Sequence, residues 1–421
     1  MKGLTLTLLF FCPLAASYAT PADTTQPAAA RPIRTTLAAP LPWNPSGDFI
    51  PVRILNDAGL ANYTNITLDW ELRVNGVVRQ KSTRTTLPLI PHRPATLRLP
   101  IKAIGSSGDE LYLGLRYHYR NKPASSAPAP KGQSPNGAAP QPTLAEEQIQ
   151  LRPWTNTSLA FHPNGELTFT DENGLFTIQS STARLRFDKQ TGWLVTYEVQ
   201  NTPLLADTPG LKPHFWLGPG EPSYKPENAQ ASPSWQTASQ GGPHLQLFST
   251  STGSQLVIIR TEYTLPETAC LLHLSYTINA TGEILVESSL EADSTRQAPH
   301  EPLPCFGMTG LFSRAFDTVT VYGPKTPADS TPYIYSLPAT PTRESGYYPA
   351  VRRWTFTYDG KGLQLTADSA LLAIGQNAGN RLTIDQSIPP YQLPYGNRRY
   401  TFKLTPVLPE EKITPRTNTR K

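Results

Sequence analysis

Apolar and polar residues alternate along many short segments of this chain, as in strands with one buried and one exposed face. Residues 50–55 begin the series, and residues 67–74 continue it up to an Asn-Gly dipeptide at 75–76. The apolar pattern resumes at residues 77–78, so we predict a two-residue β-hairpin here. Further alternating segments are residues 96–101 and 111–117. Short strands with a turn about every ten residues predict a β-sandwich.

A second and larger region, residues 158–408, repeats this alternation. Its clearest segments are residues 167–170, 183–187, 255–259, 283–287, 354–358 and 400–404. Asp188 and Gly192 flank a turn, and Leu185, Phe187, Trp193 and Val195 can pack across the resulting hairpin. No ten-residue helical period occurs after the first twenty residues. The pattern therefore predicts an all-β protein and excludes a TIM barrel in this chain, because eight alternating helices would be evident.

Proline-rich composition marks the connections between these regions. Proline accounts for 44 of 421 residues, about twice the usual ~5%. Residues 20–41 are rich in Ala, Pro and Thr and are interpreted as a linker, and residues 121–143 as a disordered insert that buries no apolar surface. We therefore predict one domain at residues 42–155, a second at 158–408 and a basic tail at 409–421.

The first nineteen residues have the pattern of a signal peptide. Lys2 provides the positive start, residues 4–14 form a short apolar core, and Ser17 and Ala19 are the small residues before a cleavage site. We expect cleavage after Ala19 and a secreted or periplasmic protein. Neither this segment nor any later one is long enough to be a membrane span.

Generic signals for binding and catalysis are weak. The net charge of +5 is modest, and no basic face interleaved with aromatic residues is present, so we expect no nucleic-acid partner. Metalloprotease, phosphate-loop, serine-hydrolase and paired-cysteine motifs are absent from the sequence. We accordingly expect no catalytic residue, no metal and no cofactor. Glu283 and Glu287 share one face of a strand, as carboxylates of a solvated face do.

Two cysteines remain after the expected cleavage, Cys270 and Cys305. Both lie in strand-like segments about 35 residues apart, consistent with neighbouring antiparallel strands. Export to an oxidising compartment favours a disulfide between them. Two small buried hydrophobic residues fit the same pattern.

Longer segments resemble, in order, the C-terminal region of β-galactosidases. TNITLDWELRVNGVVRQ (64–80), DELYLGLRYHYR (109–120) and LAEEQIQL (144–151) resemble the immunoglobulin-like domain that follows the catalytic barrel. The segments that resemble the family's last domain, also found as the small chain of two-chain enzymes, are 185–216, 274–287, 303–308, 315–324, 331–336, 351–368 and 381–386. The resemblance implies an immunoglobulin-like β-sandwich followed by a large antiparallel supersandwich similar to aldose mutarotases.

The resemblance fails where the family contacts sugar. The family's catalytic carboxylates come from the barrel, which this chain lacks, and the polar rim loops are replaced here by residues 217–223, 322–330 and 387–391. Any glycan contact is therefore expected on the last domain, in or beside these replaced loops. The candidate sugar-contact residues are Trp216, Tyr224, Trp235, Tyr322 and Arg381.

Three classes of function stay open. The first is a non-catalytic accessory module of glycan metabolism that binds carbohydrate or docks on a separate barrel-bearing chain. The second is a small chain that completes a β-galactosidase together with a glycoside hydrolase large chain. The third is a mutarotase- or lyase-like enzyme. The altered rim loops favour the first class over the second. Because the pair of barrel carboxylates is missing, we predict that the chain alone does not hydrolyse β-galactosides.

Overall fold

The computed structural model describes most of the two strand-rich regions. The described residues are 32–38, 49–57, 65–84, 87, 89–102, 108–120, 143–155, 159–206, 210–218, 232–293, 301–313, 316–326, 331–338, 346–368, 372–376, 381–386 and 393–408. The predicted signal peptide, residues 121–142 of the predicted insert and the basic tail lie outside them. Among the described residues, no helix has the length and apolar character needed to cross a membrane.

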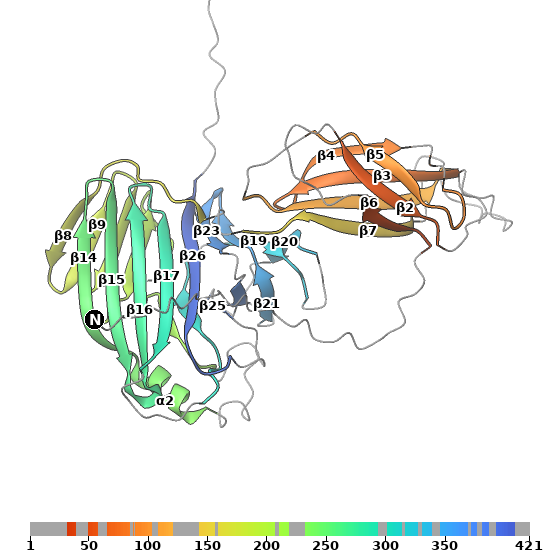
Figure 1. Cartoon of the computed structure of the whole chain (residues 1–421). Helices are drawn as coiled ribbons and strands as arrows, with labels where there is room; N and C mark the ends of the chain where they lie inside the picture. The colour runs from red at the N-terminus through yellow and green to blue at the C-terminus, as the bar shows by residue number, and fades with distance from the viewer. Residues whose placement is uncertain are drawn as a thin grey trace, which may run out of the picture.

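The N-terminal strands form two antiparallel sheets, at the right of Figure 1. The three-stranded sheet has the order β1-β2-β5 and the four-stranded sheet the order β4-β3-β6-β7. Their bounds are β1 Arg34–Leu37, β2 Ile50–Leu55, β3 Ile66–Val74, β4 Val77–Arg84, β5 Ala95–Leu99, β6 Leu111–Tyr119 and β7 Thr143–Arg152. Val52, Leu68, Leu72 and Leu113 meet in a shared core, because alternate residues of both sheets face inward. Val74 pairs with Val77, which confirms the predicted hairpin.

The prediction of a linker at residues 20–41 is wrong for residues 34–37, which form a strand. Residues 34–37 form β1, which pairs antiparallel with β2. Ile33 is fully buried beside this strand, and the Thr35 hydroxyl lies 2.7 Å from the Tyr117 hydroxyl across the sandwich. A distant partner strand and a buried side chain thus outweigh the local Ala/Pro/Thr composition.

The remaining strands form a larger sandwich of three antiparallel sheets, at the left of Figure 1. The sheet orders are β12-β11-β10-β9-β8, β13-β18-β25-β24-β21 and β14-β15-β16-β17-β26-β23-β22-β19-β20. The bounds of the first strands are β8 Thr168–Glu172, β9 Leu175–Gln179, β10 Ala183–Asp188, β11 Leu194–Val199, β12 Thr202–Pro203, β13 Lys212–His214, β14 His244–Thr252, β15 Leu256–Leu265, β16 Cys270–Asn279 and β17 Ile284–Ala292. Those of the others are β18 Gly307–Leu311, β19 Thr318–Gly323, β20 Tyr333–Pro338, β21 Gly346–Val351, β22 Arg353–Tyr358, β23 Lys361–Ala367, β24 Leu372–Gln376, β25 Arg381–Asp385 and β26 Arg398–Val407.

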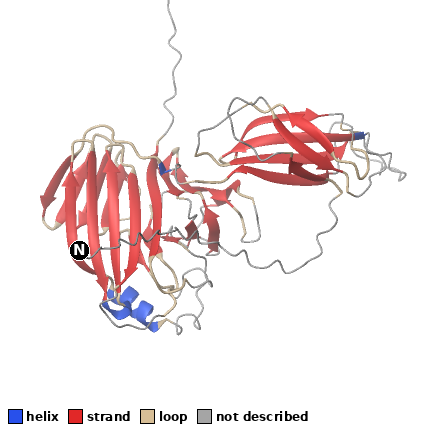
Figure 2. Cartoon of the chain, in the orientation of Figure 1, coloured by secondary structure: helices blue, strands red, loops and turns tan. Residues whose placement is uncertain are grey.

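The predicted all-β class is confirmed, as Figure 2 shows. Strand β16 illustrates why, since Leu272, Leu274 and Tyr276 are buried while the residues between them are more exposed. The described helices are the nine-residue α2 (Pro233–Gly241) and the short η3 (Pro266–Thr268). Alternation of period two thus runs through both sandwiches, and one continuous core lies between the sheets of the larger one.

A buried ion pair joins the two sandwiches. Glu110, just before β6, accepts hydrogen bonds from Arg352 Nε at 2.6 Å and Nη2 at 2.9 Å. The Tyr322 hydroxyl of β19 donates to the same carboxylate at 2.6 Å. Trp154, which follows β7, packs edge-on against Tyr322 and donates its indole N–H to the Ala367 carbonyl. These contacts fix the first sandwich against the second.

Candidate functional site

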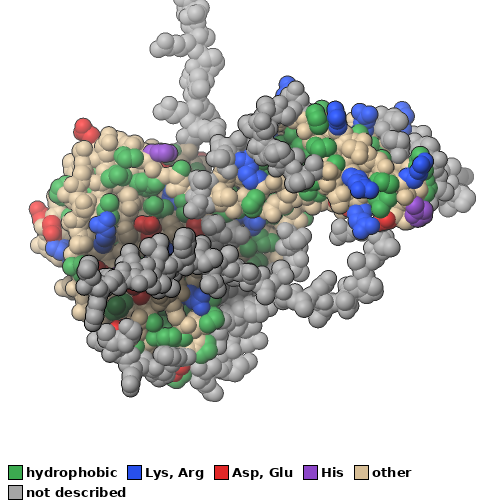
Figure 3. Space-filling model, viewed as in Figure 1, with side chains coloured by type: hydrophobic (Ala, Val, Ile, Leu, Met, Phe, Trp, Pro, Cys, Tyr) green, Lys and Arg blue, Asp and Glu red, His purple; other side chains and the backbone are tan. Residues whose placement is uncertain are grey.

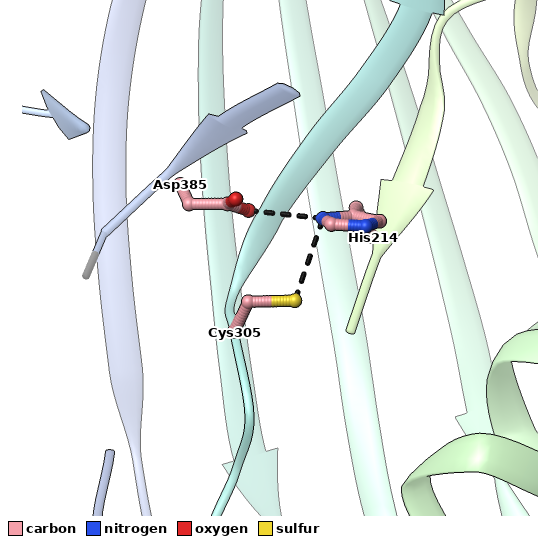
Figure 4. A group of neighbouring side chains, drawn as sticks. All are labelled: His214, Cys305 and Asp385. Carbon is pink, nitrogen blue, oxygen red and sulfur yellow. Dashed lines mark hydrogen bonds and ion pairs between the residues drawn. The ribbon is translucent and has the colours of Figure 1, made fainter. Parts of the chain in front are cut away.

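Three neighbouring strands of the sheet β13-β18-β25-β24-β21 bring a histidine, a cysteine and an aspartate together. Strand β18 lies between β13 and β25, and the register places His214, Gly307 and Asp385 in one row. Cys305 precedes Gly307 by two residues. Because side chains alternate across a strand, Cys305 and Gly307 face the same side of the sheet. The polar side chains therefore converge above the central glycine (Figure 4). We call His214, Cys305 and Asp385 the HCD cluster.

Gly307 makes this convergence sterically possible. A Cβ atom at this position would collide with the Ile384 carbonyl oxygen and with the Asp385 carboxylate. The missing side chain leaves room for His214 and Asp385 to reach one another across the middle strand. The site thus depends on one glycine, whose role is close packing rather than an unusual backbone angle.

The HCD cluster is compact and buried. His214 Nδ1 lies 3.1 Å from Asp385 Oδ1 and 3.4 Å from Cys305 Sγ. Cys305 and Asp385 are 0% exposed, and His214 is 6% exposed. Burial by itself lowers the pKa of His214, but Cys305 and Asp385 together raise it well above its usual value. The imidazolium form is thereby favoured, with the Asp385 carboxylate as its counter-charge.

The geometry differs from that of a nucleophile activated by a base. In a catalytic triad, the nucleophile and the carboxylate contact opposite nitrogens of the imidazole ring. Here both the thiol and the carboxylate contact Nδ1, as the two dashed lines in Figure 4 show. One nitrogen cannot both receive the thiol proton and hold a proton for the carboxylate. These contacts therefore differ from the nucleophile–histidine–carboxylate order of a triad.

Aromatic side chains from the nine-stranded sheet adjoin the HCD cluster. The Tyr400 ring of β26 packs edge-on against Phe306, with ring centroids 4.8 Å apart. Burial raises the pKa of Tyr400 well above its usual value, so the phenol stays neutral beside the cluster. The polar group is thus enclosed in the core of the larger sandwich.

The HCD cluster offers one nitrogen, one sulfur and one oxygen ligand within 4.8 Å of one another. No short motif in the sequence marks this site, because Cys305 and Asp385 are 91 and 171 residues away from His214. Only the strand order β13-β18-β25 brings them together. The prediction that the protein binds no metal follows from the absence of short metal-binding motifs, and these three residues form no such motif.

Two of the candidate sugar-contact residues are core residues. Trp235 in α2 is 1% exposed, packs against Phe215 and donates its indole N–H to the Glu301 carbonyl. Tyr322 is likewise 1% exposed and belongs to the ion-pair joint between the sandwiches. Neither can offer an aromatic face to a sugar, so these two assignments are wrong. The third candidate, Tyr224, lies outside the described residues.

The other two candidates are partly exposed but far apart. Trp216 lies two residues beyond His214, and Arg381 lies four residues before Asp385. His214 and Asp385 share a row, and β13 and β25 run in the same direction on either side of β18. Trp216 follows β13 in a bend, beyond the His214–Gly307 pair, whereas Arg381 pairs with Leu311 at the other end of β18. The register thus places the two candidates toward opposite ends of β18.

The two cysteines lie in different sheets and form no disulfide in the structure. Cys270 begins β16, where its thiol contacts the Tyr395 hydroxyl and the Thr268 carbonyl. Cys305 precedes β18 and contacts His214. The predicted pairing on neighbouring antiparallel strands is therefore wrong, whereas burial of both side chains agrees with the alternative interpretation.

The outer face of the nine-stranded sheet carries a shallow hollow of about 280 Å³. Arg260 and Glu262 of β15 lie on one side of it, and Glu287 of β17 and Arg399 of β26 on the other. Small serines between them leave the space open. Figure 3 shows acidic and basic side chains spread over this face of the larger sandwich. The hollow offers hydrogen-bonding groups of both signs to a polar ligand.

Comparison with known proteins identifies a β-galactosidase small-chain region. Residues 179–330 match the family model described as the β-galactosidase small chain. A curated β-galactosidase of Priestia megaterium is 27% identical over 164 residues, which cover 39% of this chain and 15% of that protein. The resemblance stated from the sequence is confirmed for this region. The chain spans about 15% of the length of this curated relative.

Solved structures that align with part of this chain include a putative aldose 1-epimerase and a galactose 1-epimerase. A putative aldose 1-epimerase from Escherichia coli K12 aligns with a TM-score of 0.36 and 11% identity, covering 57% of this chain and 100% of that chain. Galactose 1-epimerase from Lactobacillus acidophilus NCFM aligns with a TM-score of 0.32 and 9% identity, covering 58% and 99% respectively.

Proposed function

We propose that this chain is an exported, non-catalytic accessory protein of glycan metabolism, built around a β-galactosidase small-chain region. The observation that carries the proposal is the small-chain match over residues 179–330 in a chain whose described part is built of antiparallel sheets. The match supports a role in glycan metabolism, and the N-terminal sequence pattern supports export.

The chemistry of the HCD cluster supports the non-catalytic role. A retaining glycosidase uses two carboxyl groups about 5–5.5 Å apart, one as acid/base and one as nucleophile. The HCD cluster contains one carboxylate, Asp385, which is fully buried and engaged with His214. A side chain in that state can neither protonate a leaving group nor attack a sugar carbon.

A second candidate function is that of a small chain completing a separate barrel-bearing hydrolase. The description of the matching family model favours it, since a small chain implies a large one. The buried state of His214 and Asp385 disfavours a mutarotase-like enzyme acting through these residues.

If the protein binds a glycan, the candidate binding surfaces among the described residues are Trp216 and the hollow beside Arg260 and Glu287. Aromatic faces stack on sugar C–H groups, and charged side chains bond to hydroxyls. A glycan array with the wild type, Trp216→Ala and Glu287→Ala tests this part. Binding that neither substitution weakens would exclude both surfaces.

Purification of the tagged chain from its native producer separates the two candidates. The accessory proposal predicts co-elution with a hydrolase that retains its β-galactosidase activity after this chain is removed. A hydrolase that loses activity on removal, and regains it when the purified chain is added back, would establish the small-chain function instead. β-Galactosidase activity in the isolated chain would contradict both.

A further inference from the structure

We propose that His214, Cys305 and Asp385 bind one zinc ion that ties three strands of the larger sandwich together. The proposal goes beyond the accessory function and does not depend on it. It rests on the distances between three ligand atoms, on their burial and on the charge that the interior must balance.

The distances fit a tetrahedral ion. Typical Zn–N, Zn–O and Zn–S bonds of about 2.0–2.3 Å give ligand-to-ligand separations of roughly 3.3–3.6 Å at tetrahedral angles. The observed Nδ1–Oδ1 separation is 3.1 Å, the Sγ–Nδ1 separation is 3.4 Å, and all three atoms lie within 4.8 Å of one another. The two separations that involve Nδ1 thus lie within a few tenths of an ångström of the tetrahedral values, and Sγ and Oδ1, at most 4.8 Å apart, would move toward each other by up to about 1 Å to hold the ion.

The direction of the side chains supports the same interpretation. Sγ and Oδ1 both approach the ring nitrogen Nδ1, so once an ion displaces the protons of His214 and Cys305, three ligand atoms face a common region (Figure 4). A single proton on Nδ1 serves two acceptors poorly, whereas a cation can accept one lone pair from each atom.

The charge is balanced with the ion in place. Two positive charges of zinc offset the Cys305 thiolate and the Asp385 carboxylate, while His214 is neutral. A buried group of net zero charge avoids the large cost of isolated charges in the interior. All three side chains are at most 6% exposed, and zinc keeps the zero net charge that the imidazolium and the carboxylate have without it, because His214 and Cys305 each lose a proton.

The ligand types select the ion. Zinc binds thiolate, imidazole and carboxylate together, whereas Mg²⁺ and Ca²⁺ prefer oxygen ligands. The cluster supplies sulfur and nitrogen along with one oxygen. His214 belongs to β13, Asp385 belongs to β25, and Cys305 lies two residues before β18, so a bound ion would cross-link three adjacent strands and stabilise the sheet.

Titration of the purified, reduced chain with Zn²⁺ tests the proposal. We expect about one equivalent to bind, with a rise in melting temperature that Mg²⁺ and Ca²⁺ do not reproduce. Cys305→Ser and Asp385→Asn should each weaken binding at least about 100-fold, because even loss of a residue that only supports a ligand costs 10–100-fold. Cys270→Ser is the matched control, since Cys270 is buried in another sheet, and it should bind zinc like the wild type.

Cobalt(II) provides a readout that does not depend on stability. The wild type and Cys270→Ser should show a thiolate-to-cobalt absorption band, and Cys305→Ser should lack it while its circular dichroism shows a folded chain. No zinc binding by the wild type would overturn the proposal. Equal zinc binding by the wild type and folded Cys305→Ser or Asp385→Asn would overturn it as well, by placing the ion elsewhere.

Discussion

The ion pair between the two sandwiches yields the most quantitative prediction. Glu110 is 0% exposed and Arg352 is 8% exposed, so Glu110→Gln leaves a buried guanidinium without its counter-charge. Removing one partner of a buried pair typically costs about 3–5 kcal/mol. At an m-value of about 3 kcal/mol/M, the urea midpoint of the joined sandwiches should fall by roughly 1–2 M.

Glu146→Gln is the matched control for this substitution. It breaks the Arg116–Glu146 pair, whose side chains are both 54% exposed. Exposed pairs contribute about 0–1 kcal/mol, so the midpoint should move by no more than about 0.3 M. Urea unfolding followed by tryptophan fluorescence and circular dichroism measures both variants. If Glu110→Gln shifts the midpoint no further than Glu146→Gln, the ion pair does not hold the joint.

Tyr322→Phe tests the third member of the joint. It removes the hydroxyl that donates to Glu110 at 2.6 Å, and hydrogen bonds to charged groups contribute about 1.5–3 kcal/mol. In the Glu110→Gln background the same change should cost less, because the charged acceptor is already absent. Fully additive effects in this double-mutant cycle would refute the direct coupling.

Three further predictions concern the interior. Burial raises the pKa of Tyr197 and Tyr276 well above 10, so their contribution to stability is full below pH 10 and is lost as the pH rises further. Absorbance and circular dichroism should show that these tyrosines ionise together with unfolding. Their ionisation in a folded chain would contradict this prediction. Gly307→Ala should destabilise the protein by about 1–3 kcal/mol or more. Gly241→Ala, where a Cβ meets nothing within 4 Å, should have little effect. Equal melting temperatures of the two variants would disprove the packing argument. Cys270 and Cys305 should react with an alkylating reagent only after denaturation and without prior reduction, because both side chains are buried and form no disulfide. Alkylation that occurs only after reduction would show a bridge.

The features predicted correctly from sequence were local. The Asn75-Gly76 turn specified its hairpin through two adjacent residues, both of which have positive φ. The turn at 188–192 did so as well: Gly192 has a φ of 74°, the Asp188 carboxylate accepts the backbone N–H of Gln190, and β10 pairs with β11. Such signals need no information about distant parts of the chain.

The features missed were those that depend on distant partners. The sequence predicts a linker at residues 34–37, because the pairing of β1 with β2 and the burial of Ile33 are not visible in local composition. The sequence predicts surface positions for Trp235 and Tyr322, because they lie in or beside the segments that replace the family's rim loops, whereas their partners, Glu301 and Glu110, lie 66 and 212 residues away. The HCD cluster escaped detection for the same reason, since strand order alone assembles it.

Hydrolysis of a nitrophenyl β-galactoside by the isolated mature chain tests the proposed function most directly. The chain should be purified free of co-eluting hydrolases and assayed with and without zinc. The non-catalytic account predicts no turnover above the uncatalysed background in either condition, because no pair of carboxylates is available at the HCD cluster. Turnover well above background that a single Glu or Asp substitution in this chain abolishes would contradict it.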